Sequence, residues 1–358
     1  MKIKNNIKAY VLRLLTDKKS VDFDIKKSHS VLFLRYDRIG DMIITTPVFR
    51  ELKNLYPNIN VIVLASKLNK GVLLNNPNIN EIYTCSKNNI LSDIFLLIKL
   101  RSKKIDVCVE FDHSVVPHAI IRLRAIKPKK IISVAKYGRY GVNKNELGLY
   151  DIFTEKTKGQ HQSDIWLNTI RPFGVSPKSN KYDLYITEKQ ESLAKKFLKK
   201  YSNKSLIGIN FEGAVKGKKI KFSKFKEILR GIYRVKNDIQ VIILSSPEKF
   251  EFFNKKISDM GLEYVISSYQ THTILDVAAL IKQLDLVITP DTSIVHIASA
   301  FNIPIVSIHE ANEDSYNLFA PKSENSRTVF SEFPDRLEGY NVGKIIENSI
   351  ELLKKNEG

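Results

Sequence analysis

The sequence predicts an α/β protein composed of two doubly wound domains, and three observations indicate this fold class. Short apolar runs typical of buried parallel strands alternate with segments of helical periodicity through most of the chain. The alternation is interrupted by the segment 171–177, which holds two prolines and a glycine, and then restarts. The length of 358 residues suits two domains of ordinary size.

The first domain begins with the expected strand 31–34, in which every residue is apolar. The turn Ile39-Gly40-Asp41 follows, and Thr45-Thr46-Pro47 leads into a helix that we place at 47–55. The remaining strands are expected at 61–65, 82–84, 107–110 and 130–134. The other helices are expected at 68–75, 90–101, 116–126 and 161–173. This order predicts a parallel sheet with helices on both faces.

The same alternation recurs after the interruption. Strands are expected at 206–210, 240–244, 264–266, 286–289 and 304–309. Helices are expected at 188–201, 223–235, 247–260, 273–284, 292–301 and 342–355. We therefore divide the chain into a basic amphipathic N-terminal extension (1–30), an N-terminal domain (31–175), a C-terminal domain (176–340) and a C-terminal helix (341–358).

The charge of the chain predicts an anionic partner. There are 57 Lys plus Arg against 38 Asp plus Glu, a formal net charge of +19. Nucleic acid, an acidic membrane surface or a phosphorylated substrate would suit it, but no nucleic-acid-binding motif is present. No apolar run reaches the roughly 18 to 20 residues that span a bilayer, and no signal peptide is evident. Cys85 and Cys108 form no disulfide or metal pattern and fit a reducing cytoplasm.

Two segments concentrate the positive charge. At the N-terminus, Ile3, Ile7, Tyr10, Val11, Leu14 and Leu15 fall on one helical face, and Lys2, Lys4, Lys8 and Arg13 lie largely elsewhere. Such a helix either lies in the interface of an anionic leaflet or docks on the protein's own surface. The second segment, 113–145, contains eight lysines and arginines and no acidic residue. It either faces an anion or forms an ordinary solvated surface.

Asp41 is the first candidate for chemistry because it follows a predicted strand at the carboxyl edge of the first sheet. Open α/β sheets bind their ligands beside that edge. The Asp41 carboxylate can act as a general base, or it can cap a helix that begins near Ile43. The residue types alone leave both roles open.

The second domain carries two candidate phosphate-binding turns. The segment 286–296 combines a strand, a turn and a helix start, where free backbone amides suit a phosphate. Asp291, Thr292 or Ser293 could equally serve as a simple helix cap. The segment 208–214 ends another strand in a glycine-bearing loop, followed by Lys216, Lys218 and Lys219. Lysine ammonium groups can offset the negative charge on a departing phosphate oxygen.

Three segments carry a resemblance to a known family: RYDRIGDMIITTP at 35–47, FEGAVKGKK at 211–219 and ITPDTSIVHIASAFNIPIVSIHE at 288–310. In order and spacing they resemble glycosyltransferase family 9, the bacterial ADP-heptose:lipopolysaccharide heptosyltransferases. The resemblance implies a GT-B architecture of two Rossmann-like doubly wound domains with an interdomain cleft. It also implies that the first domain mainly binds the acceptor, that the second mainly binds the sugar nucleotide, and that the transfer is inverting.

The resemblance further implies roles for individual residues. Asp41 matches the carboxylate proposed as general base for the acceptor hydroxyl. The expected donor-binding residues are Gly213, Ala214, Lys218, Lys219, Asp291, Thr292, Ser293 and His296, with Lys218 matching the diphosphate-contacting lysine best and Lys219 as the alternative. Independently of the resemblance, the expected acceptor-side residues are Arg35, Gly40, Thr45, Asp112, His113, Arg122 and Arg124. Asp112 and His113, at the carboxyl edge of the first domain, could equally form a turn. The chain departs from many members at Ser293, where they have glycine, and at Ile220, where they have an aromatic residue.

The expected function is inverting, metal-independent transfer of heptose or a related sugar from a nucleotide-diphosphate donor, ADP-heptose, to a lipopolysaccharide core or similar glycolipid. No cofactor beyond this co-substrate is expected, and neither Asp22-Phe23-Asp24 nor Glu110-Phe111-Asp112 joins a further ligand at metal spacing. The expected partners are the donor, a phosphorylated glycolipid acceptor and an anionic inner-membrane surface, without nucleic acid. The expected location is the cytoplasm, peripheral on the inner face of the cytoplasmic membrane.

Two alternatives stay open. One is a GT-B enzyme that uses a UDP- or GDP-sugar for another surface glycan. The other is a non-enzymatic module that binds an anionic surface or nucleic acid and uses the fold only as a scaffold.

Overall fold

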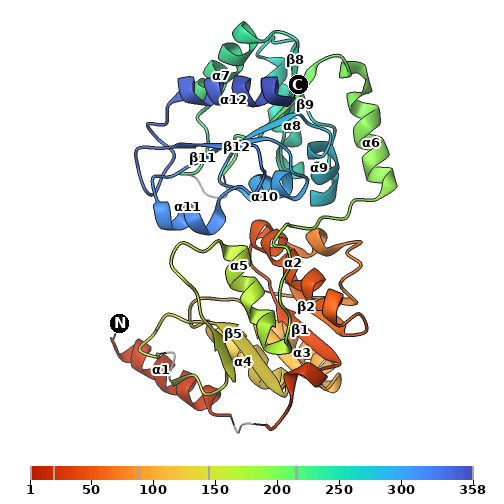
Figure 1. Cartoon of the computed structure of the whole chain (residues 1–358). Coiled ribbons are helices and arrows are strands. Elements are labelled where there is room, and N and C mark those ends of the chain that lie inside the picture. Colours follow the sequence, from red (N-terminus) through yellow and green to blue (C-terminus); the bar gives the residue numbers. More distant parts are fainter. Residues whose placement is uncertain (1, 19–20, 87–88, 144–145, 214–216, 357–358) are drawn as a thin grey trace. The chain divides into compact units, whose positions relative to one another are not determined.

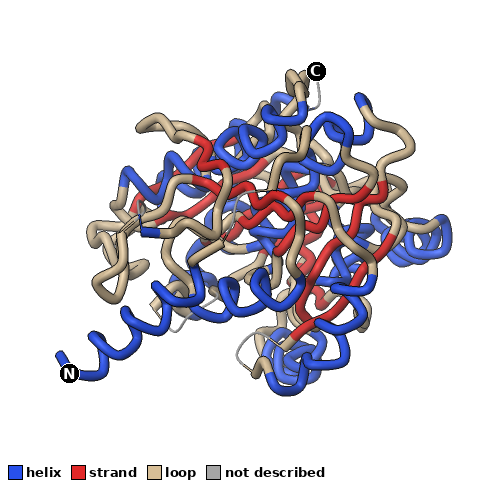
Figure 2. The backbone as a smooth tube through the Cα atoms, turned by 90° about the horizontal axis from the view of Figure 1, so that it is seen from below, coloured by secondary structure: helices blue, strands red, loops and turns tan. Residues whose placement is uncertain are grey.

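The computed structural model describes residues 2–18, 21–86, 89–143, 146–213 and 217–356, and within these ranges it describes side chains from Ala9 to Lys355. The chain divides into two compact units, Met1–Asn180 and Lys181–Gly358 (Figure 1). Each unit consists of strands flanked by helices (Figure 2). The division follows Asn180, in the coil segment just after the predicted boundary at 175.

The first unit is built on one parallel sheet of six strands in the order β3-β2-β1-β4-β5-β6. Its strands are β1 (Ser30–Leu34), β2 (Asn60–Ser66), β3 (Glu81–Cys85), β4 (Val107–Glu110), β5 (Lys130–Val134) and β6 (Ile152–Thr154). This is the Rossmann strand order, and the chain reverses direction across the sheet between β1 and β4. Leu34 is paired in register with Glu110, so the residues that follow both strands meet at one edge.

Helices cover both faces of this sheet. They are α1 (Lys2–Thr16), α2 (Ile39–Leu55), α3 (Ile94–Ser102), α4 (Pro117–Ile126) and α5 (Gln162–Leu167), with 3-10 segments at Ile25–Lys27, Lys70–Leu73, Leu91–Asp93 and Asn168–Phe173. One hydrophobic cluster joins Leu32 and Leu34 of β1 to the buried sides of α1, α3 and α4. Phe33 points to the opposite face and packs edge-on against Phe49 of α2, with ring centroids 5.0 Å apart.

The second unit repeats this plan with the strand order β12-β11-β10-β7-β8-β9, again all parallel. The strands are β7 (Ser205–Ile209), β8 (Ile239–Ile243), β9 (Val265–Ser267), β10 (Leu286–Pro290), β11 (Ile305–His309) and β12 (Ser326–Phe330). The helices are α6 (Glu188–Leu198), α7 (Phe222–Val235), α8 (Phe250–Ser258), α9 (Ile274–Ile281), α10 (Ser293–Ala300), α11 (Glu313–Phe319) and α12 (Val342–Asn356), with 3-10 segments at Lys199–Tyr201 and Pro247–Lys249. The reversal point here lies between β7 and β10.

The predicted fold class, two Rossmann-like parallel sheets, is confirmed. The predicted start of the first long helix is wrong, because α2 begins at Ile39 and contains both Gly40 and Pro47. Proline removes the hydrogen bond that its own N–H would donate to the carbonyl four residues earlier. That carbonyl, of Ile43, instead accepts a hydrogen bond of 2.7 Å from the Thr46 hydroxyl, so the helix continues through the proline.

Three elements are absent from the sequence prediction: β6, α11 and β12. The two strands lie at the outer edges of their sheets, where most of their residues are only partly buried, so they lack the apolar run of a central strand. Helix α11 has no buried residue and therefore shows no apolar stripe. Among the described residues, no helix has both the length and the apolar character needed to cross a bilayer.

Candidate active site

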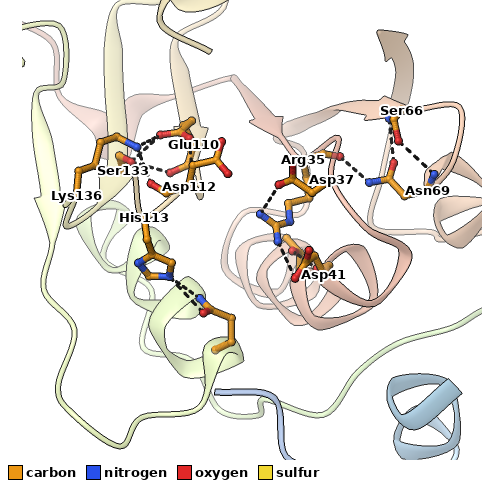
Figure 3. Close-up of polar contacts among 12 residues, drawn as sticks. Arg35, Asp37, Asp41, Ser66, Asn69, Glu110, Asp112, His113, Ser133 and Lys136 are labelled. Carbon is orange, nitrogen blue, oxygen red and sulfur yellow. Dashed lines mark hydrogen bonds and ion pairs between the residues drawn. The ribbon is translucent and has the colours of Figure 1, made fainter. Parts of the chain in front are cut away.

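The carboxyl edge of the first sheet is organised around Arg35, the first residue after β1. Its side chain is 4% exposed, and the guanidinium carbon lies 4.0 Å from the ring centre of Trp166 in α5. A planar, weakly hydrated guanidinium stacks well on an indole face. Two carboxylates share this cation: Asp37 lies 3.2 Å from Nη1, and Asp41 lies 3.2 Å from Nη2 (Figure 3). Arg35 therefore orients both carboxylates.

Asp41 lies in the first turn of α2, where the helix dipole favours a negative charge. The N-cap residue is Arg38, whose side chain makes no capping hydrogen bond. The alternative that Asp41 caps a helix beginning near Ile43 is wrong, because the helix has already begun at Ile39. The Asp41 side chain is 19% exposed, so its carboxylate is accessible to a ligand.

A second polar cluster follows β4, the neighbour of β1. Glu110 is completely buried, and its Oε2 forms an ion pair with Lys136 Nζ. Ser133 Oγ donates to the same carboxylate at 2.9 Å, and the Asp112 main-chain N–H donates to Oε1 at 2.9 Å. Lys136 Nζ also donates to the Asp112 carbonyl at 2.6 Å. These bonds fix the loop that carries Asp112 and His113 (Figure 3).

This loop places two titratable groups with shifted pKa values at the sheet edge. Burial, reinforced by the Glu110 carboxylate, raises the pKa of Asp112 to about 7. Burial, reinforced by the charge of Lys156, lowers the pKa of His113 to about 4. The His113 Nε2 is hydrogen-bonded to the Gln162 side chain. Near neutral pH, His113 is uncharged and Asp112 is partly ionised, a state that suits proton exchange.

The two shifts oppose each other in the pH dependence of stability. From about pH 4 to 7, the folded state keeps a proton on Asp112 that the unfolded chain has released, so this group lowers stability as pH rises. From about pH 4 to 6.5, the unfolded chain keeps a proton on His113 that the folded state lacks, so this group raises stability as pH rises. In the wild type the two contributions largely cancel.

We expect single substitutions to expose each contribution. Asp112→Asn should give a free energy of unfolding that rises more steeply than that of wild type between about pH 4 and 6.5, since only the His113 contribution remains. His113→Gln should change the slope in the opposite direction, and each change should amount to about 1 kcal/mol or more over this range. Denaturant titrations at several pH values measure both, and parallel pH curves for all three proteins would contradict the assignment.

The remaining predicted acceptor-side residues are placed differently. Gly40 lies beside Asp41 in the first turn of α2. Thr45 is fully buried, and its hydroxyl donates to the Asp41 carbonyl at 2.8 Å. Arg124 is exposed in the last turn of α4, about 10 Å along the helix from the end that follows β4. Thr45 packs inside the fold and Arg124 lies on its outer surface, so neither adjoins Asp41 with an open side chain, and their contact with the acceptor stays a prediction.

The position of Arg122 also differs from the expected acceptor-side surface, because its side chain is completely buried. Its Nη2 pairs with Asp93 at 2.8 Å, and its guanidinium carbon lies 4.8 Å from the ring centre of Tyr36. A buried cation needs such a partner, because it has lost the solvation of water. Arg122 therefore belongs to the interior of the first unit rather than to an acceptor-binding surface.

In the second unit, Lys218 reaches from the loop after β7 to residues that follow two other strands. Its Nζ lies 2.8 Å from Glu310, after β11, and 3.6 Å from Asp291, after β10. An ammonium group has three donors, so Lys218 can retain these partners and still donate to a bound anion. Lys219 is exposed and forms no ion pair with any residue that the structure describes. Lys218 is thus the better placed of the two candidate lysines.

Gly213 allows the lysine loop to fold back closely. A Cβ atom at this position would lie 1.6 Å from the main-chain carbonyl oxygen of Lys218, far inside van der Waals contact. Only glycine fits without moving the loop, so Gly213 determines where Lys218 sits. Its neighbour Ala214, also a predicted donor-binding residue, lies outside the described residues.

A hydrogen-bond network holds the start of α10. The Asn210 amide donates to the hydroxyls of Thr289, at 3.1 Å, and Thr292, at 3.2 Å. Thr292 is the N-cap of α10, and its hydroxyl accepts from the Ile294 N–H. Ser293 is the first residue of the helix, where main-chain N–H groups lack an intrahelical acceptor. These groups adjoin Asp291, so the edge combines a helix N-terminus with the Lys218 ammonium and suits a phosphorylated ligand.

His296 lies in α10, one turn beyond the helix start, and is largely buried. It is 4% exposed, and its ring packs edge-on against Tyr182, with centroids 5.9 Å apart. The side chain supports the packing of α10, and its expected role in donor binding stays a prediction.

Several residues at these edges were missed by sequence reasoning: Asp37, Glu110, Lys136, Trp166, Asn210 and Glu310. Asp37, Asn210 and Glu310 each follow a strand closely, and that position could have identified them. Trp166 and Lys136 carried no such signal. Their contacts with Arg35 and Glu110 join residues far apart in the sequence.

The two Rossmann-like units have the GT-B architecture, and charged residues lie at the reversal point of each sheet. Residues 99–338 match the model of glycosyltransferase family 9 (heptosyltransferase). The chain belongs to this family and is therefore a glycosyltransferase.

Individual relatives agree with this assignment. The lipopolysaccharide core heptosyltransferase OpsX of Haemophilus influenzae is 24% identical over 87% of this chain and 92% of its own length. Lipopolysaccharide heptosyltransferase 3 of Escherichia coli is 24% identical over 80% of this chain and 84% of its own length. The structure of the Escherichia coli ADP-heptose lipopolysaccharide heptosyltransferase II matches with a TM-score of 0.73 at 18% identity, over 92% of this chain and all (100%) of that one. The last similarity concerns the fold.

Proposed function

We propose that this chain transfers heptose, or a closely related sugar, from ADP-heptose to a lipopolysaccharide core or similar glycolipid, with inversion at the anomeric carbon. The observation that carries the proposal is the edge of the second sheet, where Lys218, Asp291 and the start of α10 adjoin. Family membership supports the reaction class. The names of the relatives, which give lipopolysaccharide and ADP-heptose, support the acceptor and the donor.

On the donor side, the Lys218 ammonium and the first N–H groups of α10 bind the diphosphate, because both present hydrogen-bond donors and positive charge. The Asp291 carboxylate accepts hydrogen bonds from the ribose hydroxyls. Glu310, which is buried against Lys218, keeps the ammonium in position.

On the acceptor side, Asp41 removes the proton of the acceptor hydroxyl while the acceptor oxygen attacks the anomeric carbon. The bond between that carbon and the diphosphate oxygen breaks, and ADP departs. Lys218 offsets the negative charge that grows on the departing oxygen. These steps use no metal ion and no further cofactor.

The acceptor in this proposal is a phosphorylated glycolipid, reached at the anionic inner face of the cytoplasmic membrane. The net charge of +19 supports an anionic acceptor and an anionic surface.

A nucleotide panel tests the donor. We expect ADP to raise the melting temperature of the protein more than UDP or GDP at equal concentration, because at a given ligand concentration the more tightly bound ligand stabilises the folded state more. Differential scanning fluorimetry measures the shift, and Lys218→Met serves as a control in which the ADP shift should shrink. A larger shift with UDP or GDP would replace ADP-heptose by the alternative donor class.

A further inference from the structure

The first unit exposes an apolar stripe on the helical segment from Leu91 to Ser102. Its members recur at helical spacing, and all four are exposed: Leu91 (79%), Ile94 (46%), Phe95 (86%) and Ile98 (60%). The opposite side of α3 packs into the core through Leu97 and Leu100. Helix α3 is therefore apolar on both sides, and one of these sides has no protein to cover it among the described residues. An exposed cluster of this kind is typical of an interaction surface.

Helix α1 also exposes apolar side chains. The residues that it buries differ from those on the predicted apolar face. Ala9 and Leu12 are buried in the core of the first unit, and Thr16 is bonded to the Glu146 carbonyl at 3.0 Å. Tyr10 and Leu14, predicted to lie on one apolar face, remain 64% and 59% exposed. The helix is thus docked through one side and presents apolar groups on another.

Helices α1, α3 and α4 lie on one face of the sheet, since their buried side chains share a single hydrophobic cluster. Helix α4 contacts both of the others and lies beside α1 (Figure 1). Arg101 of α3 donates to the Ala125 carbonyl of α4 at 3.4 Å. We name this surface the α1–α4–α3 face. Its exposed apolar residues are Tyr10, Val11, Leu14, Leu91, Ile94, Phe95 and Ile98.

The charge carried by the three helices themselves has one sign. The sequences of α1, α3 and α4 contain lysines and arginines but no aspartate or glutamate. Lys99, Arg101 and Arg124 are exposed among or beside the apolar groups. Exposed aromatic and aliphatic side chains together with cations are the combination that binds an anionic membrane interface.

We infer that the α1–α4–α3 face docks on the anionic leaflet of a phospholipid bilayer, with Phe95 and Ile98 entering the headgroup region and the cations contacting lipid phosphates. A second copy of the chain fits less well, because a two-fold contact through this face would set its cations against each other. The role of this docking, which is to reach a glycolipid acceptor at the membrane, rests on the proposed function. The binding itself needs no acceptor and no donor.

Deletion of residues 1–20 would test this surface poorly, because it removes Ala9 and Leu12 from the core. Substitution of exposed groups in the full-length protein is sharper. The test variants are Phe95→Ser/Ile98→Ser, Tyr10→Ser/Leu14→Ser and Arg101→Ser/Arg124→Ser. The matched control is Leu193→Ser/Phe252→Ser, which removes apolar groups of the second unit that are also exposed (47% and 55%). Circular dichroism establishes that each variant is folded.

Sedimentation with vesicles measures the binding. Wild type and control should bind vesicles of phosphatidylcholine with phosphatidylglycerol, and bind phosphatidylcholine alone much less. Phe95→Ser/Ile98→Ser should weaken binding to the anionic vesicles by about tenfold or more. Tyr10→Ser/Leu14→Ser should weaken it too, and Arg101→Ser/Arg124→Ser should also reduce its sensitivity to salt.

Equal binding by the Phe95→Ser/Ile98→Ser variant and wild type would overturn the assignment of this face, as would equal binding of wild type to neutral and anionic vesicles. Loss of a dimer in light scattering, without a change in vesicle binding, would assign the face to a second copy instead. Turnover of a delipidated acceptor should be the same for wild type and Phe95→Ser/Ile98→Ser. An absence of turnover in both, with vesicle binding as expected, would count against the proposed reaction and not against the membrane surface.

Discussion

Asp41→Asn should lower kcat by about a hundredfold to ten-thousandfold, the usual contribution of a general base, while the affinity for the nucleotide stays within about twofold of wild type. Asparagine preserves the size of the side chain and can still accept a hydrogen bond from Arg35, but it does not take up a proton at the reaction pH. The nucleotide is assigned to the second unit, so its binding should not depend on Asp41. Steady-state kinetics and calorimetric titration with ADP measure the two quantities.

Asp37→Asn is the matched control for this substitution. Asp37 and Asp41 both lie 3.2 Å from the Arg35 guanidinium, and their side chains are similarly exposed (21% and 19%). If Asp41 acts as the base, Asp37→Asn should lose much less turnover. Equal losses would mean that the ion pairs with Arg35, rather than proton transfer, explain the effect.

Asp112 is the competing carboxylate at the same edge, because its pKa of about 7 is well matched to proton transfer. We expect Asp112→Asn to retain most of the turnover at neutral pH. If Asp112→Asn abolishes turnover and Asp41→Asn does not, the role of base passes to Asp112.

Lys218→Met should lower kcat/KM by about a hundredfold to a thousandfold, since it removes the cation that faces the departing diphosphate. Methionine retains much of the length and apolar volume of the lysine stem while removing the charge. Lys218→Arg keeps the charge but replaces a compact ammonium by a planar fork, so an intermediate loss is expected. Initial rates at varied donor concentration measure these effects.

Lys219→Met is the control, because Lys219 is the adjacent lysine and is exposed without an ion pair to any described residue. Its kcat/KM should stay within about threefold of wild type, as for a surface charge. Thermal melting must accompany both variants, because Lys218→Met leaves Glu310, 5% exposed, without its cation. A larger loss for Lys219→Met would exchange the roles of the two lysines.

The sheets were the most predictable part of the fold. Central parallel strands are buried on both faces, so they form apolar runs whose ends are visible in the sequence, and β4 and β5 match their predicted bounds. The start of α2 was not predictable in this way. Gly40 and Pro47 resemble helix breakers, and only the hydrogen bond from Thr46 to the Ile43 carbonyl shows why the helix tolerates the proline.

The residues of the candidate sites were likewise predictable only in part. Asp41, Asp112 and Asp291 were found because residues just after a strand collect at the carboxyl edge of a parallel sheet. The burial of Arg122 was not predictable, because it depends on Asp93, a residue on a different segment that neutralises it inside the core. The exposed apolar stripe of α3 was also not predictable. When a helix is apolar on both sides, its sequence does not indicate which side is buried.

The most direct test of the proposed reaction is mass spectrometry of a lipopolysaccharide core acceptor incubated with the purified protein and ADP-heptose. We expect that the acceptor gains one heptose unit, that one ADP appears for each heptose transferred, and that the new glycosidic bond has the anomeric configuration opposite to that of the donor. An acceptor that stays unmodified with ADP-heptose but gains a sugar from a UDP- or GDP-sugar would contradict it.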